Sequence, residues 1–132
     1  MGTRSLTVFM DGEEEVAVLY RQMDGYPSGH GAEIAEYLSG VPIVNGIVDN
    51  RSFNGMADLA VRLIVHLKML HGGNQPGMFY LHPAGTRDCG EEYIYTVVAR
   101  RGEPEARIHC QDVGDLGFAG PASMMLPRLR AA

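Results

Sequence analysis

Residues 55–70, with the sequence GMADLAVRLIVHLKML, carry the strongest structural signal in the chain. Most positions are apolar, and the polar residues Asp58, Arg62 and His66 recur four residues apart, which is the spacing of one face of a helix. This pattern predicts a helix that is packed on most of its circumference, with Asp58 and Arg62 as a solvated ion pair. The glycines after His71 are typical of a helix end.

The residues before this helix predict a hairpin and a shorter helix. Residues 3–10 and 16–22 read as strands around Asp11-Gly12, a pair that is typical of a hairpin turn. In the first strand Leu6, Val8 and Met10 are predicted on one face, and Ser5, Thr7 and Phe9 on the other. Residues 32–38 have the spacing of a short amphipathic helix that ends at Ser39-Gly40. Between the two helices, residues 41–54 are expected to form a loop that contains a short strand at 42–44.

The residues after the helix predict further strands. Residues 77–82, 92–100 and 105–111 read as extended, with a turn at 101–104. From Gly114 onward no periodicity is visible, so an irregular tail is expected, with residues 126–132 disordered. The order ββ-α-α-βββ favours the α+β class, as a mostly antiparallel sheet of about five strands with a long helix packed on one face. A length of 132 residues indicates a single domain.

Composition and charge exclude several classes of partner. The chain is 45% hydrophobic and 20% charged, as in ordinary globular proteins, and its formal net charge is −5. A sequence pI near 5.4 argues against non-specific nucleic-acid binding, which requires a basic surface. No apolar run approaches the roughly 20 residues needed to span a bilayer, and no signal-peptide pattern is visible. We therefore expect a cytoplasmic protein that does not engage the membrane.

The two cysteines, Cys89 and Cys110, do not have the spacing of a redox pair or a zinc site. In a reducing cytosol both are expected to be free thiols. The alternative is a disulfide, if their strands are neighbours.

The candidate site lies at residues 20–31, YRQMDGYPSGHG, where three glycines and one proline separate a predicted strand from a predicted helix. Loops at such junctions often carry binding groups on a rigid frame. Arg21, Asp24, Tyr26 and His30, together with Arg4, are the candidate ligand-binding residues, and a glycine-rich helix start suits an anion. The alternative is that the glycines and the proline only turn the chain. The loop matches neither the Walker A nor the Rossmann pattern.

Other chemistries find weaker support. A nucleophile at Cys89 or Ser28 would need His30 or His82 as its base, and no motif brings these residues together. A metal site from Asp24, His30 and His82 is conceivable, although no histidine pair has a tight ligand spacing. The sequence therefore predicts no catalytic residue and no metal ligand, and it leaves any cofactor unknown.

The opening Met1-Gly2-Thr3-Arg4-Ser5 and the segment Asp24-Gly25-Tyr26-Pro27 resemble a group of uncharacterised bacterial and bacteriophage proteins. Members of that group begin Met-Gly/Ala-Thr-Arg-Ser and carry an aromatic-Asp-Gly-Tyr-Pro segment near residue 25; this chain has Met23 at the aromatic position. The resemblance covers about the first 40 residues well, and residues 89–93 more loosely. It implies a bacterial or phage origin and no activity.

Three hypotheses about function follow. The first is a small binding protein for an anionic metabolite or nucleotide, with its pocket at residues 24–31. The second is a protein-interaction or structural module that forms a homo-oligomer through the exposed sheet face and the methionines Met124 and Met125. The third is an enzyme that acts on a phosphorylated small molecule, with His30 as acid or base.

Overall fold

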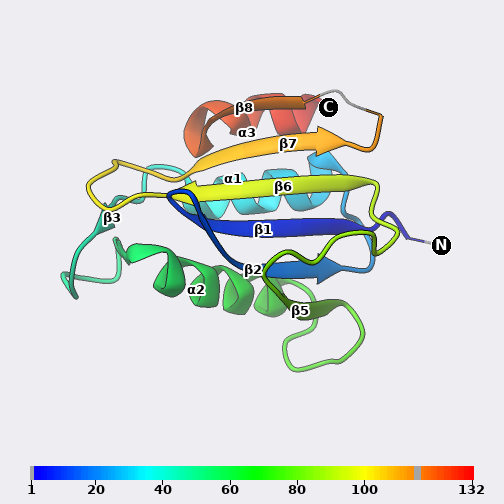
Figure 1. Ribbon diagram of the computed structural model, residues 1–132, viewed down its shortest axis with the longest axis horizontal. Helices are drawn as coiled ribbons and strands as arrows, with labels where there is room; N and C mark the ends of the chain where they lie inside the picture. The colour runs from blue at the N-terminus through cyan, green and yellow to red at the C-terminus, as the bar shows by residue number, and fades with distance from the viewer. Residues whose placement is uncertain (1, 115–116) are drawn as a thin grey trace.

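The N-terminal hairpin lies within a six-stranded sheet, as seen in a computed structural model that describes residues 2–114 and 117–132 (Figure 1). The strand order is β5-β2-β1-β6-β7-β8. The bounds are Ser5–Asp11 for β1, Glu14–Arg21 for β2, Phe79–Pro83 for β5, Tyr93–Ala99 for β6, Arg107–Asp112 for β7 and Gly117–Pro121 for β8. Strands β1 and β6 pair in parallel, and the other neighbours in this sheet are antiparallel.

One face of the sheet carries the main core. Helices α1 (Ala32–Leu38), α2 (Gly55–Leu70) and α3 (Ala122–Ala131) contribute buried side chains to the same cluster as Phe9, Leu19 and Val97 of the sheet. Figure 1 shows α1 and α3 behind the strands. A π-helical turn, η1 (Pro27–Gly31), leads directly into α1.

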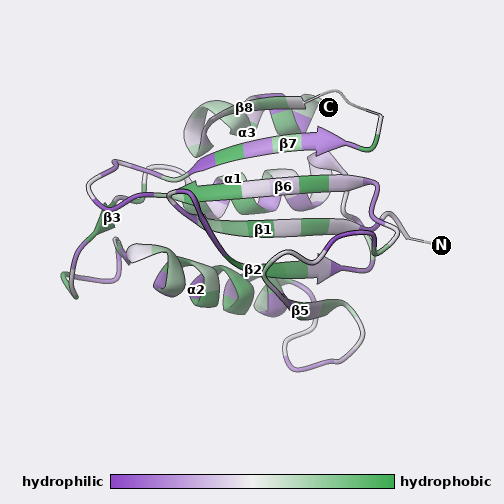
Figure 2. Ribbon diagram, viewed as in Figure 1, coloured by the Kyte–Doolittle hydropathy of each residue, from purple (hydrophilic) through white to green (hydrophobic). Residues whose placement is uncertain are grey.

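The opposite face of the sheet holds a smaller cluster of Leu6, Val8 and Val18, against which Cys89 of the β5–β6 loop packs. Successive residues of a strand point to opposite faces, so Thr7 and Phe9 face the helices while Leu6 and Val8 face this loop. Figure 2 shows the same alternation in β7, where hydrophobic and hydrophilic residues follow one another. The two faces predicted for residues 5–10 are confirmed.

The fold class is the one that the sequence predicted, α+β with a mostly antiparallel sheet, but the strand count and order differ. The main sheet has six strands instead of five, and β3 (Ile43–Val44) and β4 (Phe53–Asn54) form a separate parallel pair. The element order is therefore ββ-α-ββ-α-ββββ-α, apart from η1.

The C-terminal region differs from the expected irregular tail. Strand β8 follows β7 in antiparallel pairing, and α3 then occupies 122–131, with Met125 and Leu129 buried in the main core. The sequence pattern does not predict β8 or α3, because both elements contain glycine or proline, which disfavour strands and helices in isolation. These residues are Gly117, Gly120, Pro121 and Pro127. Burial against the sheet and α1 outweighs that local preference. Residues 115–116 of the expected tail lie outside the described residues.

Helix α2 has the bounds that the sequence predicted, but less of its circumference is buried than expected. Val61, Val65 and Met69 are 62%, 56% and 74% exposed, and their spacing places them on one outer stripe. The apolar arc of the sequence is therefore wider than the buried face of the helix. Across the described residues, no helix combines the length and the apolar character that crossing a membrane requires.

Candidate functional site

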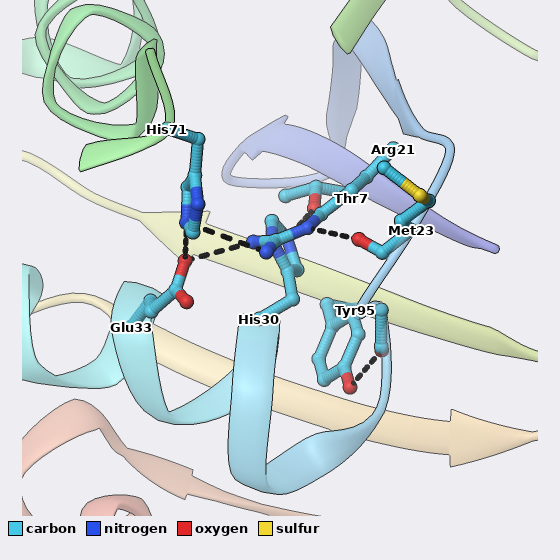
Figure 3. A network of polar contacts seen from close by, with 8 residues as sticks. Thr7, Arg21, Met23, His30, Glu33, His71 and Tyr95 are labelled. Atoms are coloured by element: carbon cyan, nitrogen blue, oxygen red, sulfur yellow. Dashed lines mark hydrogen bonds and ion pairs between the residues drawn. The ribbon is translucent and has the colours of Figure 1, made fainter. Parts of the chain in front are cut away.

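The guanidinium of Arg21, at the end of β2, is the centre of a buried polar network (Figure 3). The side chain has no solvent exposure. Its Nη1 donates to Glu33 Oε1 at 2.8 Å, and its Nε donates to the Met23 carbonyl at 2.6 Å. Phe79 lies beside it, with the ring centroid 5.3 Å from the guanidinium carbon. A buried arginine of this kind requires such partners, because an unpaired charge inside a protein is very costly.

His30 lies between Arg21 and β1 and is also fully buried. Arg21 Nη1 lies 3.0 Å from His30 Nδ1, and Thr7 Oγ1 lies 2.6 Å from Nε2. A guanidinium only donates, so Nδ1 accepts and the proton resides on Nε2, which donates to Thr7. Burial lowers the pKa of His30 well below its usual value, and the charges of Arg21 and His71 lower it further. His30 is therefore neutral, and both of its ring nitrogens make hydrogen bonds.

Glu33 and His71 carry the network to the surface. Their side chains are 25% and 24% exposed, and His71 Nε2 lies 2.8 Å from Glu33 Oε1. The same nitrogen lies 3.3 Å from Arg21 Nη2. One ring nitrogen cannot both donate and accept, so the shorter contact, in which Nε2 donates to the carboxylate, is the hydrogen bond. The pair joins α1 to the C-terminal end of α2.

The loop between β2 and η1 is fixed by its own backbone groups. Asp24 has φ 60°, and its carbonyl accepts the His30 backbone N–H at 3.0 Å. The buried hydroxyl of Tyr95 donates to the Gly25 carbonyl at 2.6 Å. A Cβ on Gly25 would come within 2.7 Å of the Ser5 side chain, so only glycine fits here. The glycines of this segment therefore serve close packing. None of Gly25, Gly29 and Gly31 has a positive φ, so the alternative, in which they only turn the chain, does not explain them.

The structure separates the five predicted ligand-binding residues. Arg21 and His30 are brought together, but both are inaccessible and engaged with protein partners. Arg4 lies elsewhere, with its Nη1 against Gly90 of the β5–β6 loop. Asp24 is exposed on its turn, and Tyr26 is 40% exposed. Of the five, Tyr26 is the residue that lines the cavity described below.

The residues considered for a nucleophilic site or a metal site are not brought together either. His82 contacts Tyr20 edge-on, on the sheet face away from His30, so a site of Asp24, His30 and His82 does not form. Among the described residues no group of three or more His, Cys, Asp or Glu side chains has metal-binding geometry. Cys89 and Cys110 are free thiols on opposite faces of the sheet. Burial, with Glu91 and Asp88 nearby, raises the pKa of the Cys89 thiol, which opposes the role of nucleophile.

A cavity of about 640 Å³ opens between η1, the sheet and α3. Three aromatic side chains from separate segments line it: Tyr26 before η1, Tyr93 on β6 and Phe118 on β8. Its size lies within the range of about 300–1,000 Å³ that is typical of small-molecule sites.

The polar groups of this cavity are Ser28, Asp112 and Arg128, and Cys110 also lines it. The guanidinium carbon of Arg128 lies 4.3 Å from the centroid of the Phe118 ring, a cation–π contact that holds the cation over the ring. Asp112 Oδ1 accepts the Gly114 backbone N–H at 2.9 Å. Burial raises the pKa of Cys110 to about 11, so this thiol is uncharged at neutral pH.

Sequence reasoning missed most of this cavity. Tyr93, Asp112, Phe118 and Arg128 belong to β6, β7, β8 and α3, which are far apart in the chain or were not predicted. The usable signal was the predicted alternation of residues 92–100, which places Tyr93 on the same face as Val97. No sequence signal linked Arg128 to that face.

Comparison with models of known protein families, with curated proteins and with solved structures finds no match to this chain. The geometry of the site therefore carries the functional argument alone.

Proposed function

We propose that the protein binds a small molecule that carries a negative charge, in the cavity between η1, the sheet and α3. The observation that carries the proposal is the lining of this cavity, in which three aromatic side chains and one arginine surround about 640 Å³. Ligand sites are mostly apolar hollows with a few polar groups that fix orientation, and this lining has that composition.

Arg128 is the residue that supports an anionic ligand. A guanidinium offers several donors in a rigid fork and suits carboxylate or phosphate groups. The proposal keeps the class of ligand that the sequence suggested but moves the charge from Arg21 and His30 to Arg128. Tyr26 is the residue shared by both versions of the site.

Native mass spectrometry of freshly purified protein, compared with denaturing spectra, tests the proposal. We expect a non-covalent adduct that is weakened in Arg128→Gln. Arg130→Gln is the matched control, because Arg130 lies on the same helix but contacts Glu36, at 3.2 Å, outside the cavity. An adduct that is equally weakened in both variants, or in neither, would contradict the assignment to this cavity.

The second candidate function, a homo-oligomeric interaction module, is favoured by the exposed stripe of Val61, Val65 and Met69 on α2. Exposed apolar patches often mark contact surfaces. Size-exclusion chromatography with light scattering tests it: Val65→Glu should lower the oligomeric mass, whereas Met124→Glu tests the methionine contact suggested by the sequence. Met125, the other methionine of that suggestion, is buried in the core. A strict monomer at micromolar concentrations would remove this candidate.

The third hypothesis, an enzyme with His30 as acid or base, is not carried forward. His30 is fully buried and both of its ring nitrogens face protein partners, so a substrate cannot reach it without a rearrangement of the network.

A further inference from the structure

Strand β5 forms one edge of the six-stranded sheet, and its outer side is exposed. Its neighbour in the sheet is β2, and Figure 1 shows β5 at the margin of the sheet. Every residue of β5 is exposed or half-buried, with Tyr80 at 48% and Leu81 at 66%. An exposed edge strand with apolar side chains is a place where another strand can be added to a sheet.

The register with β2 identifies the backbone groups of β5 that point outward. The Gln22 N–H donates to the Met78 carbonyl at 2.9 Å, one step beyond the register pair of Arg21 and Phe79. Hydrogen-bonded and non-hydrogen-bonded pairs alternate along an antiparallel ladder. Phe79 and Leu81 therefore belong to the non-hydrogen-bonded pairs, and their N–H and C=O groups point away from β2.

Two observations define the length of this open edge. Pro83 is the next outward residue, which agrees with its lack of an N–H, and its carbonyl accepts from Thr86. Among the residues that the structure describes, no group forms a hydrogen bond with the backbone of Phe79 or Leu81 on the outer side. The edge thus offers two N–H donors and two C=O acceptors within three residues.

The charge pattern favours a second copy of the chain as the partner. Residues 69–86 contain no Asp, Glu, Lys or Arg and are the longest stretch of the sequence without a formal charge. Each chain has a net charge of −5, so two copies repel each other wherever charged surfaces meet. Natural sheets often protect an edge with charged side chains, and β5 has none. The β5 edge is therefore a surface on which two identical chains can approach.

We propose that two copies of the chain pair through antiparallel β5 strands, about a two-fold axis at Tyr80. In this register Phe79 of each copy lies opposite Leu81 of the other, so all the open N–H and C=O groups are used. Tyr80 faces Tyr80 of the other copy in a non-hydrogen-bonded pair, the type in which side chains approach most closely. Leu81, which pairs with Leu19 and lies on the same sheet face, gains the partner's Phe79 as an apolar neighbour.

Other registers use fewer of these groups. If Leu81 lies opposite its own copy, Phe79 faces Pro83, which has no N–H to donate. The two-fold arrangement is also closed, because each chain contributes its single β5 edge, and the product is a dimer and not a fibre. The inference is independent of the ligand cavity, and it places the contact between copies on the sheet edge instead of on the exposed stripe of α2.

Charge exchange at position 80 tests the axis. Size-exclusion chromatography with light scattering should show a dimer of the natural chain at micromolar concentrations. Tyr80→Lys and Tyr80→Glu should each give a monomer, because like charges would lie directly opposite each other. An equimolar mixture of the two variants should restore the dimer, since opposite charges then meet at the axis.

A second pair of variants tests the backbone hydrogen bonds. Leu81→Pro removes an N–H that points outward, so the pairing with β2 is kept while each copy loses one donor to the other. We expect the dissociation constant of the dimer to rise about tenfold or more. Leu81→Val is the matched control, because it keeps both the N–H and an apolar side chain and should remain a dimer. Thermal melting shows whether each variant is folded, and the Leu81 variants decide the result if a charged variant does not fold.

The outcomes separate the β5 contact from the other proposals. A natural chain that stays monomeric at micromolar concentrations, or a mixture of the Lys and Glu variants that fails to dimerise, would overturn the inference. A dimer that is lost in Val65→Glu but kept in Tyr80→Lys and Leu81→Pro would also overturn it and would assign the contact to α2. The adduct in native mass spectrometry, and its dependence on Arg128, decides the ligand cavity separately.

Discussion

Arg21 Nη1 and Glu33 Oε1 form an ion pair of 2.8 Å in which the arginine is wholly buried and the glutamate is 25% exposed. The carboxylate thus reaches in from the edge of the core and neutralises the inner charge. His30 Nδ1 also accepts from Nη1, and the Met23 carbonyl accepts a hydrogen bond from Nε. This arrangement makes Arg21 a structural residue that joins β2 to η1 and α1.

Arg21→Ala is expected to lower the free energy of unfolding by about 3–5 kcal/mol, because buried His30 loses the donor to its Nδ1 and Glu33 loses its ion pair and keeps only the contact with His71. Arg87→Ala is the matched control: Arg87 also pairs with a glutamate, Glu15, at 2.8 Å, but it is 38% exposed, so we expect a loss of at most about 1 kcal/mol. Urea denaturation of both variants gives the comparison. Should Arg21→Ala not fold, Glu33→Gln provides a milder test of the same pair. Equal losses for Arg21→Ala and Arg87→Ala would show that the buried network is unimportant for stability.

Stability should fall as the pH decreases below about 6.5, the ordinary value for histidine, because the pKa of buried His30 is lowered in the folded protein. Between the two values the unfolded chain binds the proton and the folded chain does not, so acid favours unfolding. The slope from this group is at most about 1.4 kcal/mol per pH unit. The pKa values of Glu15 and Glu105 are also lowered, but they start from 4.5, so their loss comes at lower pH. Denaturation curves between about pH 6.5 and 5.5 therefore record mainly the imidazole contribution, since that of the carboxyl groups begins as the pH approaches 4.5.

His30→Gln is the variant for this pH dependence, because its amide can donate to Thr7 and accept from Arg21. Its stability should depend less on pH than that of the natural chain over the same range. Tyr95→Phe serves as a control that lowers stability without removing an imidazole. The protonation of His30 also depends on the other charged groups of the network, which are Arg21, Glu33 and His71. An unchanged slope in His30→Gln would assign the pH dependence to another group.

Tyr95→Phe removes the hydroxyl that donates to the Gly25 carbonyl at 2.6 Å and leaves that carbonyl without this donor. We expect a loss of about 1–3 kcal/mol, as for a buried group left unsatisfied. Amide hydrogen exchange should quicken most at residues 22–31, since this bond ties the loop to β6. Tyr20→Phe is the control, because the Tyr20 hydroxyl donates to the side chain of Gln22, two residues along the same segment. Faster exchange spread evenly over the chain would contradict this local role.

Leu129→Ala tests whether α3 is docked as the structure places it. Leu129 has no solvent exposure, so its truncation should cost about 2–5 kcal/mol. Met124→Ala, on the same helix but 68% exposed, should change stability by about 0.5 kcal/mol or less. If residues 126–132 were disordered, as the sequence alone suggested, both substitutions would be nearly neutral in chemical denaturation.

The elements with clear periodicity were predictable from local sequence. The Asp11-Gly12 hairpin and the bounds of α1 and α2 follow from spacing and turn residues, and the structure has them. The pairing of β1 with β6 was not predictable, because it joins residues nearly ninety positions apart and is parallel. Strand β8 and helix α3 were missed because their glycines and prolines give no local signal, while their stability comes from burial.

Sequence alone determined the class of fold and the two faces of the N-terminal hairpin, and it singled out the segment around Arg21 and His30 as a candidate ligand site. Tertiary structure alone decided what that segment does. A charged residue in a glycine-rich loop reads as a ligand contact until burial is known, and burial depends on which distant residues pack over it. Here Glu33, His71 and Thr7 enclose Arg21 and His30, and the open cavity lies beyond them, between η1 and α3.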